Sequence, residues 1–182
     1  MKKIYIIFTI VFIGCNLSAQ NNTNNKHILR LVFINPGIEY EFSVSDKSKL
    51  TANIAYGLLP AYPNTTAEQP KNKLLFAPFF DVHYKMIYNK NRRETKNKSI
   101  AYNAGDFWGI KFTGRGKNYD NGVVRTDNID FAVGPVWGIQ RTVKKISFLF
   151  AVGPQYYFDT KGNSGFYPFM FEFNIAYILL AK

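Results

Sequence analysis

Large apolar and aromatic side chains alternate with small or polar side chains along most of the chain from residue 27 onward. From Leu74 to Tyr88 the apolar residues occupy the even positions, and from Tyr167 to Leu179 they occupy the odd positions. Successive side chains of a β-strand point to opposite faces, so each segment would present one continuous apolar face. No stretch has convincing helical spacing, and the pattern therefore predicts an all-β protein.

Five further segments alternate in the same way and are predicted to be strands: 38–44, 50–58, 100–112, 129–139 and 146–158. In the third of these, Asp106 is a charged exception on the apolar side. The stretch from His27 to Asn35 supplies an eighth strand, because the Pro36-Gly37 pair that follows is a strong turn signal. The alternative is one long strand over 27–45 with a bulge at this pair. We favour two strands, because a closed antiparallel barrel with both chain ends on one side needs an even number.

The two faces of these strands differ in composition. The aromatic face is nearly free of charge, whereas the other face holds Gly, Ala, Asn, Gln, Ser and scattered charges of both signs. An apolar, lipid-facing band around a polar interior is typical of transmembrane barrels. The sequence therefore predicts an antiparallel up-and-down eight-stranded membrane β-barrel over residues 27–182. Its predicted polar interior network consists of Glu39, Glu41, Asp81, His83, Lys85, Lys111, Asp130 and Glu172.

The lengths of the connections predict an orientation. Segments 45–48 and 141–145 are short, whereas 59–73 and 113–128 are long and polar. Outer-membrane barrels have short periplasmic turns and longer external loops. Counting strands upward from His27 places both short connections and both chain ends in the periplasm, with the long loops outside.

Residues 1–19 are predicted to be a secretory signal peptide. A short basic start is followed by an apolar stretch too short to span a bilayer, and then by small residues before cleavage after Ala19. Residues 20–26 are polar and are expected to be a flexible lead-in. The alternatives are lipoprotein processing at Cys15, the single cysteine of the chain, and an apolar start that is not cleaved. Cleavage after Ala19 would leave an exported chain without disulfides, stabilised by packing or by lipid.

Composition narrows the class further. Aromatic residues make up 17% of the chain, and the formal net charge is +11. The aromatic share excludes intrinsic disorder, and the residue mixture is not that of a coiled coil. No mature run reaches the roughly 18 apolar residues that a transmembrane helix needs, which excludes a helical membrane protein.

Candidate catalytic chemistry is sparse. A barrel hydrolase needs a histidine beside a serine and an orienting carboxylate near one rim. His83 lies between Asp81 and Lys85 in the middle of a predicted strand, and no serine can be placed beside it from the sequence. His27 is expected to be solvated at a strand start. Two distant histidines and no mature cysteine argue against a metal site, so we expect no enzyme, no metal and no cofactor.

The basic residues raise the question of an anionic partner. Segment 89–98 carries five basic residues and one acidic residue. Basic runs can bind nucleic acid, but an exported chain rarely meets any, so no nucleic-acid partner is expected. In the predicted topology this segment is a periplasmic turn, either plainly solvated or in contact with anionic headgroups or peptidoglycan-associated partners. Arg115, Lys117 and Arg125 in an outer loop could pair with lipopolysaccharide phosphates.

Several short phrases carry a family resemblance. The export signal ending in Ser18-Ala19-Gln20, residues 35–41 (NPGIEYE), residues 134–138 (GPVWG) and the aromatic last strand resemble small outer-membrane β-barrel proteins of Gram-negative bacteria. Within that group the chain is most similar to poorly characterised barrel-domain proteins. The resemblance covers about residues 27–182, includes no catalytic signature, and implies insertion by the outer-membrane assembly machinery. Such chains usually end on an aromatic residue, whereas this one ends Leu179-Leu180-Ala181-Lys182, with Tyr177 and Leu179 as the terminal apolar pair.

The sequence thus predicts a monomeric, integral outer-membrane barrel that contacts outer-membrane lipids. We expect a structural, adhesive or ligand-contact role through the outer loops, and not an open pore, because side chains fill an eight-stranded interior. One alternative is a lipid-modifying barrel enzyme, which a Ser or Asp near His83 at one rim would favour. The other is a soluble secreted lipocalin-like binding barrel, which an inward-facing aromatic face would favour.

Overall fold

The structure is a computed structural model that describes residues 25–65, 74–119 and 124–182. The predicted signal peptide, the alternative lipidation site at Cys15 and residues 20–24 of the predicted lead-in lie outside the described residues. Strands make up most of the described part, which also has three short helical segments. In that part no helix is long and apolar enough to cross a membrane.

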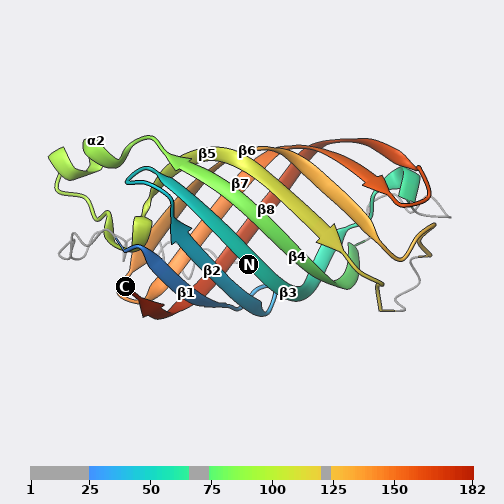
Figure 1. The fold of residues 1–182 in the computed structure, drawn as a ribbon, viewed down its shortest axis with the longest axis horizontal. Helices are drawn as coiled ribbons and strands as arrows, with labels where there is room; N and C mark the ends of the chain where they lie inside the picture. The colour runs from blue at the N-terminus through green and yellow to red at the C-terminus, as the bar shows by residue number, and fades with distance from the viewer. Residues whose placement is uncertain (1–24, 66–73, 120–123) are drawn as a thin grey trace, which may run out of the picture.

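Eight antiparallel strands follow one another around a single closed ring, and each strand pairs with the next in the chain. β8 pairs with β1 and closes the ring, with Leu31 opposite Tyr177. Figure 1 shows the strands running obliquely around the ring. The prediction of an all-β chain with eight antiparallel strands is confirmed. The strands are β1 (His27–Val32), β2 (Gly37–Ser43), β3 (Ser48–Pro60), β4 (Leu74–Ile87), β5 (Gly105–Arg115), β6 (Asp130–Val143), β7 (Ile146–Asp159) and β8 (Ser164–Ala181).

Residues 27–45 form two strands joined by a turn, and not one bulged strand. β1 and β2 pair in antiparallel register, with Val32 opposite Gly37. Pro36 cannot donate a ladder hydrogen bond, which favours a turn at this point. A Cβ atom on Gly37 would collide with the side chain of Ala55 on β3, so the first residue of β2 has to be glycine.

Two Gly-Pro pairs interrupt the ladder between β6 and β7. Gly134 precedes Pro135 on β6, and Gly153 precedes Pro154 on β7. A Cβ atom on Gly134 would collide with the Pro154 carbonyl, and one on Gly153 would collide with the Pro135 carbonyl. Each glycine therefore makes room for the backbone of a residue that cannot donate a ladder hydrogen bond. The pairing of β7 with β8 also shifts register immediately after Gly153.

The strand predicted over 100–112 begins later than expected. Residues Ala101–Asn103 form the short 3₁₀ segment η3, and β5 starts only after it. Tyr102 and the asparagine that follows have φ angles of 54° and 61°, in the left-handed region, which ends any extended run. The apolar alternation here was misleading, because Ile100 and Ala104 are buried at the end of the ring and do not face outward.

The up-and-down order divides the connections between the two ends of the ring. The connections after β2, β4 and β6 lie at the same end as His27 and Lys182, which we call the chain-terminal end, and the others lie at the far end. At the chain-terminal end, the backbone N–H of His27 donates to the carbonyl of Lys182 at 2.9 Å. The basic segment predicted as a turn contains helix α2 (Lys90–Thr95), also at the chain-terminal end (Figure 1). The division follows the expected one, except that connection 88–104 is long.

Candidate functional site

The outer face of the ring is apolar and exposed on all eight strands. Ile54 on β3 is 74% exposed, and Phe171 on β8 is 69% exposed. Soluble monomers rarely expose contiguous apolar patches larger than a few hundred Å². The outward-facing members include Leu31, Ile38, Tyr40, Ile54, Leu58, Leu74, Phe80, Trp108, Ile110, Trp137, Tyr156, Phe171, Phe173 and Leu179.

Two charged side chains lie on the outer face of the described strands, Asp106 on β5 and Arg141 on β6. Arg141 Nη2 donates to Asp106 Oδ1, so the two charges neutralise each other. Both residues lie close to the chain-terminal ends of their strands. The other aspartate, glutamate, lysine and arginine side chains of these strands are buried or point inward.

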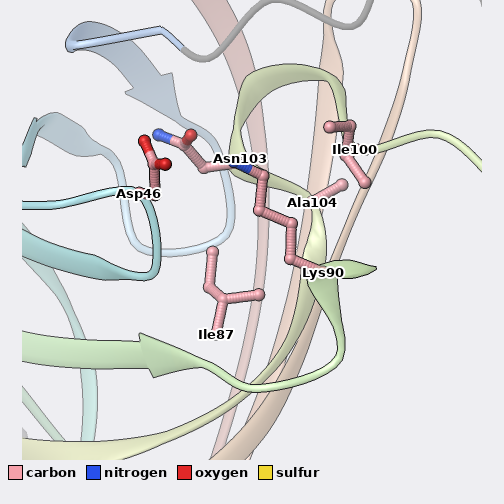
Figure 2. A pocket seen from close by; sticks show the side chains of 6 residues that line it. All are labelled: Asp46, Ile87, Lys90, Ile100, Asn103 and Ala104. Atoms are coloured by element: carbon pink, nitrogen blue, oxygen red, sulfur yellow. The ribbon is translucent and has the colours of Figure 1, made fainter. Parts of the chain in front are cut away.

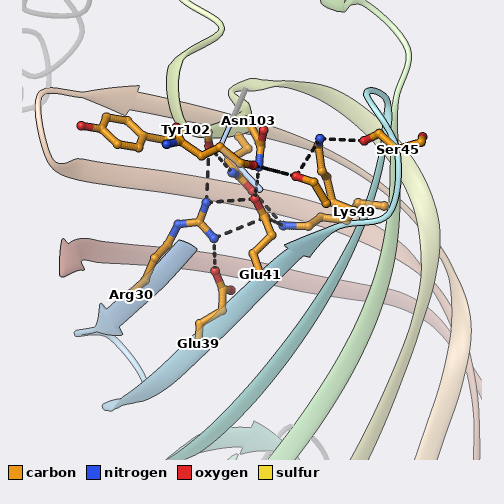
Figure 3. A network of polar contacts seen from close by, with 11 residues as sticks. Arg30, Glu39, Glu41, Ser45, Lys49, Tyr102 and Asn103 are labelled. Atoms are coloured by element: carbon orange, nitrogen blue, oxygen red, sulfur yellow. Dashed lines mark hydrogen bonds and ion pairs between the residues drawn. The ribbon is translucent and has the colours of Figure 1, made fainter. Parts of the chain in front are cut away.

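Inside the ring, near the chain-terminal end, Glu41 is surrounded by cationic side chains (Figure 3). Glu41 is fully buried, and it accepts hydrogen bonds from Lys85 Nζ at 2.7 Å and from Arg30 Nη2 at 3.3 Å. Arg30 Nη1 also donates to Glu39 Oε1 at 2.6 Å, and Lys85 Nζ donates to Gln140 Oε1 at 2.9 Å. These contacts join β1, β2, β4 and β6. Because a buried charge without a partner is strongly destabilising, the four ionic groups depend on one another.

Part of the connection between β4 and β5 folds over this end of the ring. Asn103 Nδ2 donates to Glu41 Oε1 at 2.7 Å, and the Tyr102 carbonyl accepts from Arg30 Nη2 at 3.4 Å. Asn103 is buried although it belongs to a connection. We call residues 101–103 the plug, because they lie over the chain-terminal end of the ring and are hydrogen-bonded to the ionic group inside it (Figure 3).

A second ionic group lies midway along the strands, centred on Lys111. Lys111 Nζ donates to Glu172 Oε2 at 2.7 Å and lies 3.7 Å from Asp81 Oδ2. Each carboxylate also accepts from an amide, Asp81 from Asn53 Nδ2 at 3.0 Å and Glu172 from Asn174 Nδ2 at 2.8 Å. One lysine therefore pairs with a carboxylate from β4 and with another from β8.

At the far end, Arg115 and Asp130 form a buried bidentate pair. Arg115 Nε and Nη2 donate to the two carboxylate oxygens of Asp130, both at 2.5 Å. Arg115 Nη1 donates to the Pro60 carbonyl, and Arg125 Nη2 lies 2.7 Å from Asp130 Oδ2. Bidentate charge-assisted pairs are among the strongest polar contacts in proteins, and this one joins facing residues of the neighbouring strands β5 and β6 at the far end.

Tyr62, which follows β3, packs against this pair from the connection between β3 and β4. Its ring lies over the Arg115 guanidinium, 3.9 Å from carbon to centroid, and stacks on Tyr157 at 4.4 Å between centroids. Its hydroxyl donates to Gln155 Oε1 at 3.0 Å. Burial raises the pKa of the Tyr62 phenol above its ordinary value, so the phenol stays protonated and keeps donating.

The sequence predicted a polar interior, but part of the interior is apolar. Six inward-facing residues form an apolar cluster: Ile87, Phe107, Val136, Leu149, Ala151 and Met170. His83 packs edge-on against Phe107, with 5.3 Å between ring centroids, and its ladder neighbours are Thr51 and Lys111. Its Nε2 has no hydrogen-bond partner in the described part of the chain. His83 therefore lies in mid-strand packing and not in a serine-carboxylate arrangement at a rim.

A cavity of about 10 Å³ lies beside the plug at the chain-terminal end (Figure 2). Its volume suits at most about one water molecule, whereas small-molecule sites are typically about 300–1,000 Å³. Within residues 25–65, 74–119 and 124–182, no group of three or more His, Cys, Asp or Glu side chains could hold a metal ion. The cavity is lined by Asp46, Ile87, Lys90, Ile100, Asn103 and Ala104.

The structure places the eight predicted interior residues on the inner face, but not in one network. Glu39, Glu41 and Lys85 belong to the chain-terminal group, Asp81, Lys111 and Glu172 to the middle group, Asp130 to the far group, and His83 to none of them.

Three central members of these groups were missed from the sequence. Arg30 and Arg115 have inward parity on their strands, so the alternation that identified Lys111 could have identified them too. Asn103 lies in a connection, and nothing in the local pattern marks it as buried.

The sequence suggested that Arg115 and Arg125 could pair with lipopolysaccharide phosphates, and in the structure both are engaged with Asp130. Both guanidinium groups are buried, with side chains at most 2% exposed, and both pair with Asp130. Each arginine therefore has an anionic partner within the chain. Of the three residues considered, Lys117 alone is exposed.

No protein family, curated protein or solved structure matches this chain. The class is therefore defined by fold and surface: an eight-stranded antiparallel ring with an apolar outer face and charged groups inside.

Proposed function

We propose that this protein is an integral β-barrel of a bacterial outer membrane, with the outer face of the ring in contact with lipid. The observation that carries the proposal is the distribution of side chains, with aromatic and aliphatic residues exposed and ionic residues buried. Soluble proteins normally have the reverse distribution. Transmembrane barrels need an outward apolar band and accept a polar interior.

Closure and strand length support the same proposal. A bilayer offers no water to unpaired backbone groups, so a sheet can cross it only as a closed ring without edges. Strands β3 to β8 have 11 to 18 residues, at or above the roughly 9–11 residues of a tilted membrane strand. β1 and β2 are shorter, but Phe33 and Ile34 continue the exposed apolar face beyond β1.

The Asp106–Arg141 pair fits this placement. A charge on the lipid-facing side costs about 2–4 kcal/mol at the bilayer midplane but only about 0–1 kcal/mol near an interface. The two residues are mutually neutralised and lie close to the chain-terminal end, where the interface would be.

Location is tested by fractionation. The mature protein should co-sediment with outer membranes, require detergent for extraction, and migrate faster on gels when unheated than when boiled. A known soluble periplasmic protein in the same extract serves as the control. Recovery of folded, monomeric protein in detergent-free buffer would contradict the proposal.

Orientation is tested by labelling introduced cysteines. If the chain-terminal end faces the periplasm, Lys117→Cys at the far end should react with a membrane-impermeant maleimide in intact cells. Lys145→Cys, between β6 and β7, should react only after the outer membrane is permeabilised. The opposite labelling result would show that the chain-terminal end faces the cell exterior.

We further propose a structural, adhesive or ligand-contact role through the far-end connections, without conduction. The plug with Glu41 at one end, and Arg115 with Tyr62 at the other, occupy the interior. Purified protein in a planar bilayer should give no steady single-channel current. Large, stable currents would contradict this role and indicate an open lumen.

The two alternatives receive less support. A soluble lipocalin-like binding barrel needs its aromatic face inside, whereas residues such as Phe171 and Phe173 are exposed. A lipid-modifying enzyme would need reactive groups around His83 at a rim, whereas His83 is buried in mid-strand against Phe107.

A further inference from the structure

We propose that the chain-terminal end of the ring binds the headgroups of anionic phospholipids through a rim of basic side chains. This inference rests on the proposed membrane function and adds the lipid class that the barrel selects. The segments at this end carry ten basic and two acidic residues. The ten, which we call the basic rim, are Lys26, Lys47, Lys90, Arg92, Arg93, Lys96, Lys98, Lys144, Lys145 and Lys182, and the acidic residues are Asp46 and Glu94.

Backbone contacts place the basic rim around the circumference of one end. The Lys47 carbonyl accepts from Ile87 N, and the Lys145 carbonyl accepts from Ile178 N, both at 2.8 Å. Lys26 N donates to the carbonyl of the last residue at 2.6 Å. Segments far apart in the sequence thus bring their lysines to the same level of the ring.

The side chains of the basic rim are mostly available to a partner. Eight of the ten are exposed, and Lys90 and Arg93 are half-buried. Arg93 is used inside the connection, where its Nε and Nη2 donate to the Ser99 carbonyl at 3.0 and 2.7 Å. The other arginine of α2, Arg92, is exposed.

The charge excess is specific to this end. The described far-end connections, residues 33–36, 61–65, 116–119, 124–129 and 160–163, contain three basic residues and one acidic residue. One of these three, Arg125, is already paired with Asp130. A positive surface is therefore not a general feature of the connections, although the whole chain is basic.

Interfacial aromatic residues lie next to the basic rim. Trp137 Nε1 donates to the Tyr88 hydroxyl at 2.9 Å, and Trp108 lies opposite Trp137 in the ladder. Tyr88 is the first residue after β4 and leads into α2. Tryptophan and tyrosine concentrate at the membrane–water interface. With these rings at the interface, the basic rim lies at the depth of the phosphate groups.

An anionic leaflet is the partner whose charge this surface complements. Each lysine or arginine near an anionic membrane surface strengthens binding by about fivefold, and the attraction falls off within a Debye length of about 10 Å at 0.1 M salt. Neutral or zwitterionic headgroups lack the net charge to be selected in this way. The expected ligand is therefore a phospholipid such as phosphatidylglycerol.

The two tryptophans of the chain, Trp108 and Trp137, report directly on this region. The protein is reconstituted in phosphatidylcholine vesicles that contain a brominated lipid, which quenches tryptophan fluorescence on contact. Brominated phosphatidylglycerol should quench several-fold more effectively than brominated phosphatidylcholine at low salt. The ratio should fall toward one in 1 M salt.

Charge-removal variants at the two ends of the ring distinguish the effect of the basic rim on lipid preference from the effect of overall charge. Arg92→Gln, Lys96→Gln, Lys98→Gln and Lys145→Gln together should lower the quenching ratio at least threefold. The pair Lys96→Gln and Lys98→Gln should give an intermediate loss. The control variant, Lys117→Gln with Lys161→Gln, removes the same number of charges as this pair at the far end and should leave the ratio unchanged. Unheated gel mobility verifies that each variant is folded.

The outcomes distinguish this inference from the proposed function. Equal quenching by both lipids, or an equal loss in the Lys96 and Lys98 pair and in the control variant, would overturn the basic rim as a lipid-selective surface while leaving membrane insertion intact. Loss of the preference on adding inorganic phosphate, but not chloride of equal ionic strength, would also overturn it, in favour of a small-anion site. No quenching by either lipid would contradict insertion itself and this inference with it.

Discussion

Lys85 on β4 donates a hydrogen bond to Glu41 on β2 at 2.7 Å, across the interior of the ring and between strands that are not neighbours. The two side chains are at most 2% exposed. Neither charge can be compensated by water, so Lys85 depends on Glu41, and Glu41 depends on both Lys85 and Arg30. The contact therefore stabilises the chain-terminal end by joining β2 and β4 across the interior.

Lys85→Met should lower the free energy of unfolding by about 3 kcal/mol, because it leaves the buried Glu41 carboxylate with one cation fewer. The double variant with Glu41→Gln should cost clearly less than the sum of the single variants, because their loss is shared. Urea unfolding from lipid vesicles measures all three. Strictly additive costs would show that the contact carries no coupling.

Phe171→Lys and Glu172→Gln test adjacent positions on opposite faces of β8. Phe171 is exposed on the outer face, so a lysine there should cost about 2–4 kcal/mol if the site is near the bilayer midplane. Glu172 accepts from Lys111 at 2.7 Å, so Glu172→Gln should cost about 1–3 kcal/mol by weakening that pair. In detergent-free buffer with no lipid, Phe171→Lys should instead improve solubility. A tolerated Phe171→Lys in vesicles would place Phe171 outside the lipid band.

The left-handed residues of the plug should respond differently to substitution. Tyr102 contributes its carbonyl to Arg30 and has φ of 54°, so Tyr102→Gly keeps the contact and relieves the backbone, at a net cost below about 1 kcal/mol. Asn103→Ala removes the donor to Glu41 and should cost about 1–3 kcal/mol. Unfolding in urea compares the two. A larger cost for Tyr102→Gly would mean that its side chain, and not its carbonyl, fixes the plug.

Asp127 links two far-end connections and should make them sensitive to acid. The hydroxyl of Thr160 donates to its carboxylate, as does Thr160 N at 3.1 Å, and these hydrogen bonds hold the pKa of Asp127 below its ordinary value. A depressed pKa means that the contact is fully present above the pKa of the unfolded chain and is lost as pH falls through the folded value. Carbon NMR titration of Asp127 should give a low midpoint, and Thr160→Val should raise it. An unchanged midpoint in Thr160→Val would assign the shift to other groups.

The alternation of side chains determined how many strands form and which face each residue takes. In a strand, the face of a residue depends only on its parity, which is local information. The positions of Asp81, Lys85 and Lys111 on the inner face follow from this rule. The exposure of Phe171 and of Phe173, two residues further along β8, follows from it too. The turn between β1 and β2 could also be predicted from the sequence, because the Pro36-Gly37 pair is a local turn signal.

The sequence could not show where β5 begins. Ile100, Tyr102 and Ala104 alternate with polar or small residues as a strand would. Tyr102 instead adopts φ of 54°. Its carbonyl bonds to Arg30, whose place is set by strands on the other side of the ring. A contact between residues so distant in the chain leaves no periodic signal.

Tertiary structure alone decided which inward charge meets which. Lys85 reaches past β3 to Glu41, and Lys111 on β5 meets Glu172 on β8. Parity says that these residues point inward but not at what height or opposite which strand. Those depend on the stagger between strands and on closure of the ring, which all eight strands determine together. The same reason explains the basic rim: composition showed an excess of positive charge, but only closure gathered it at one end.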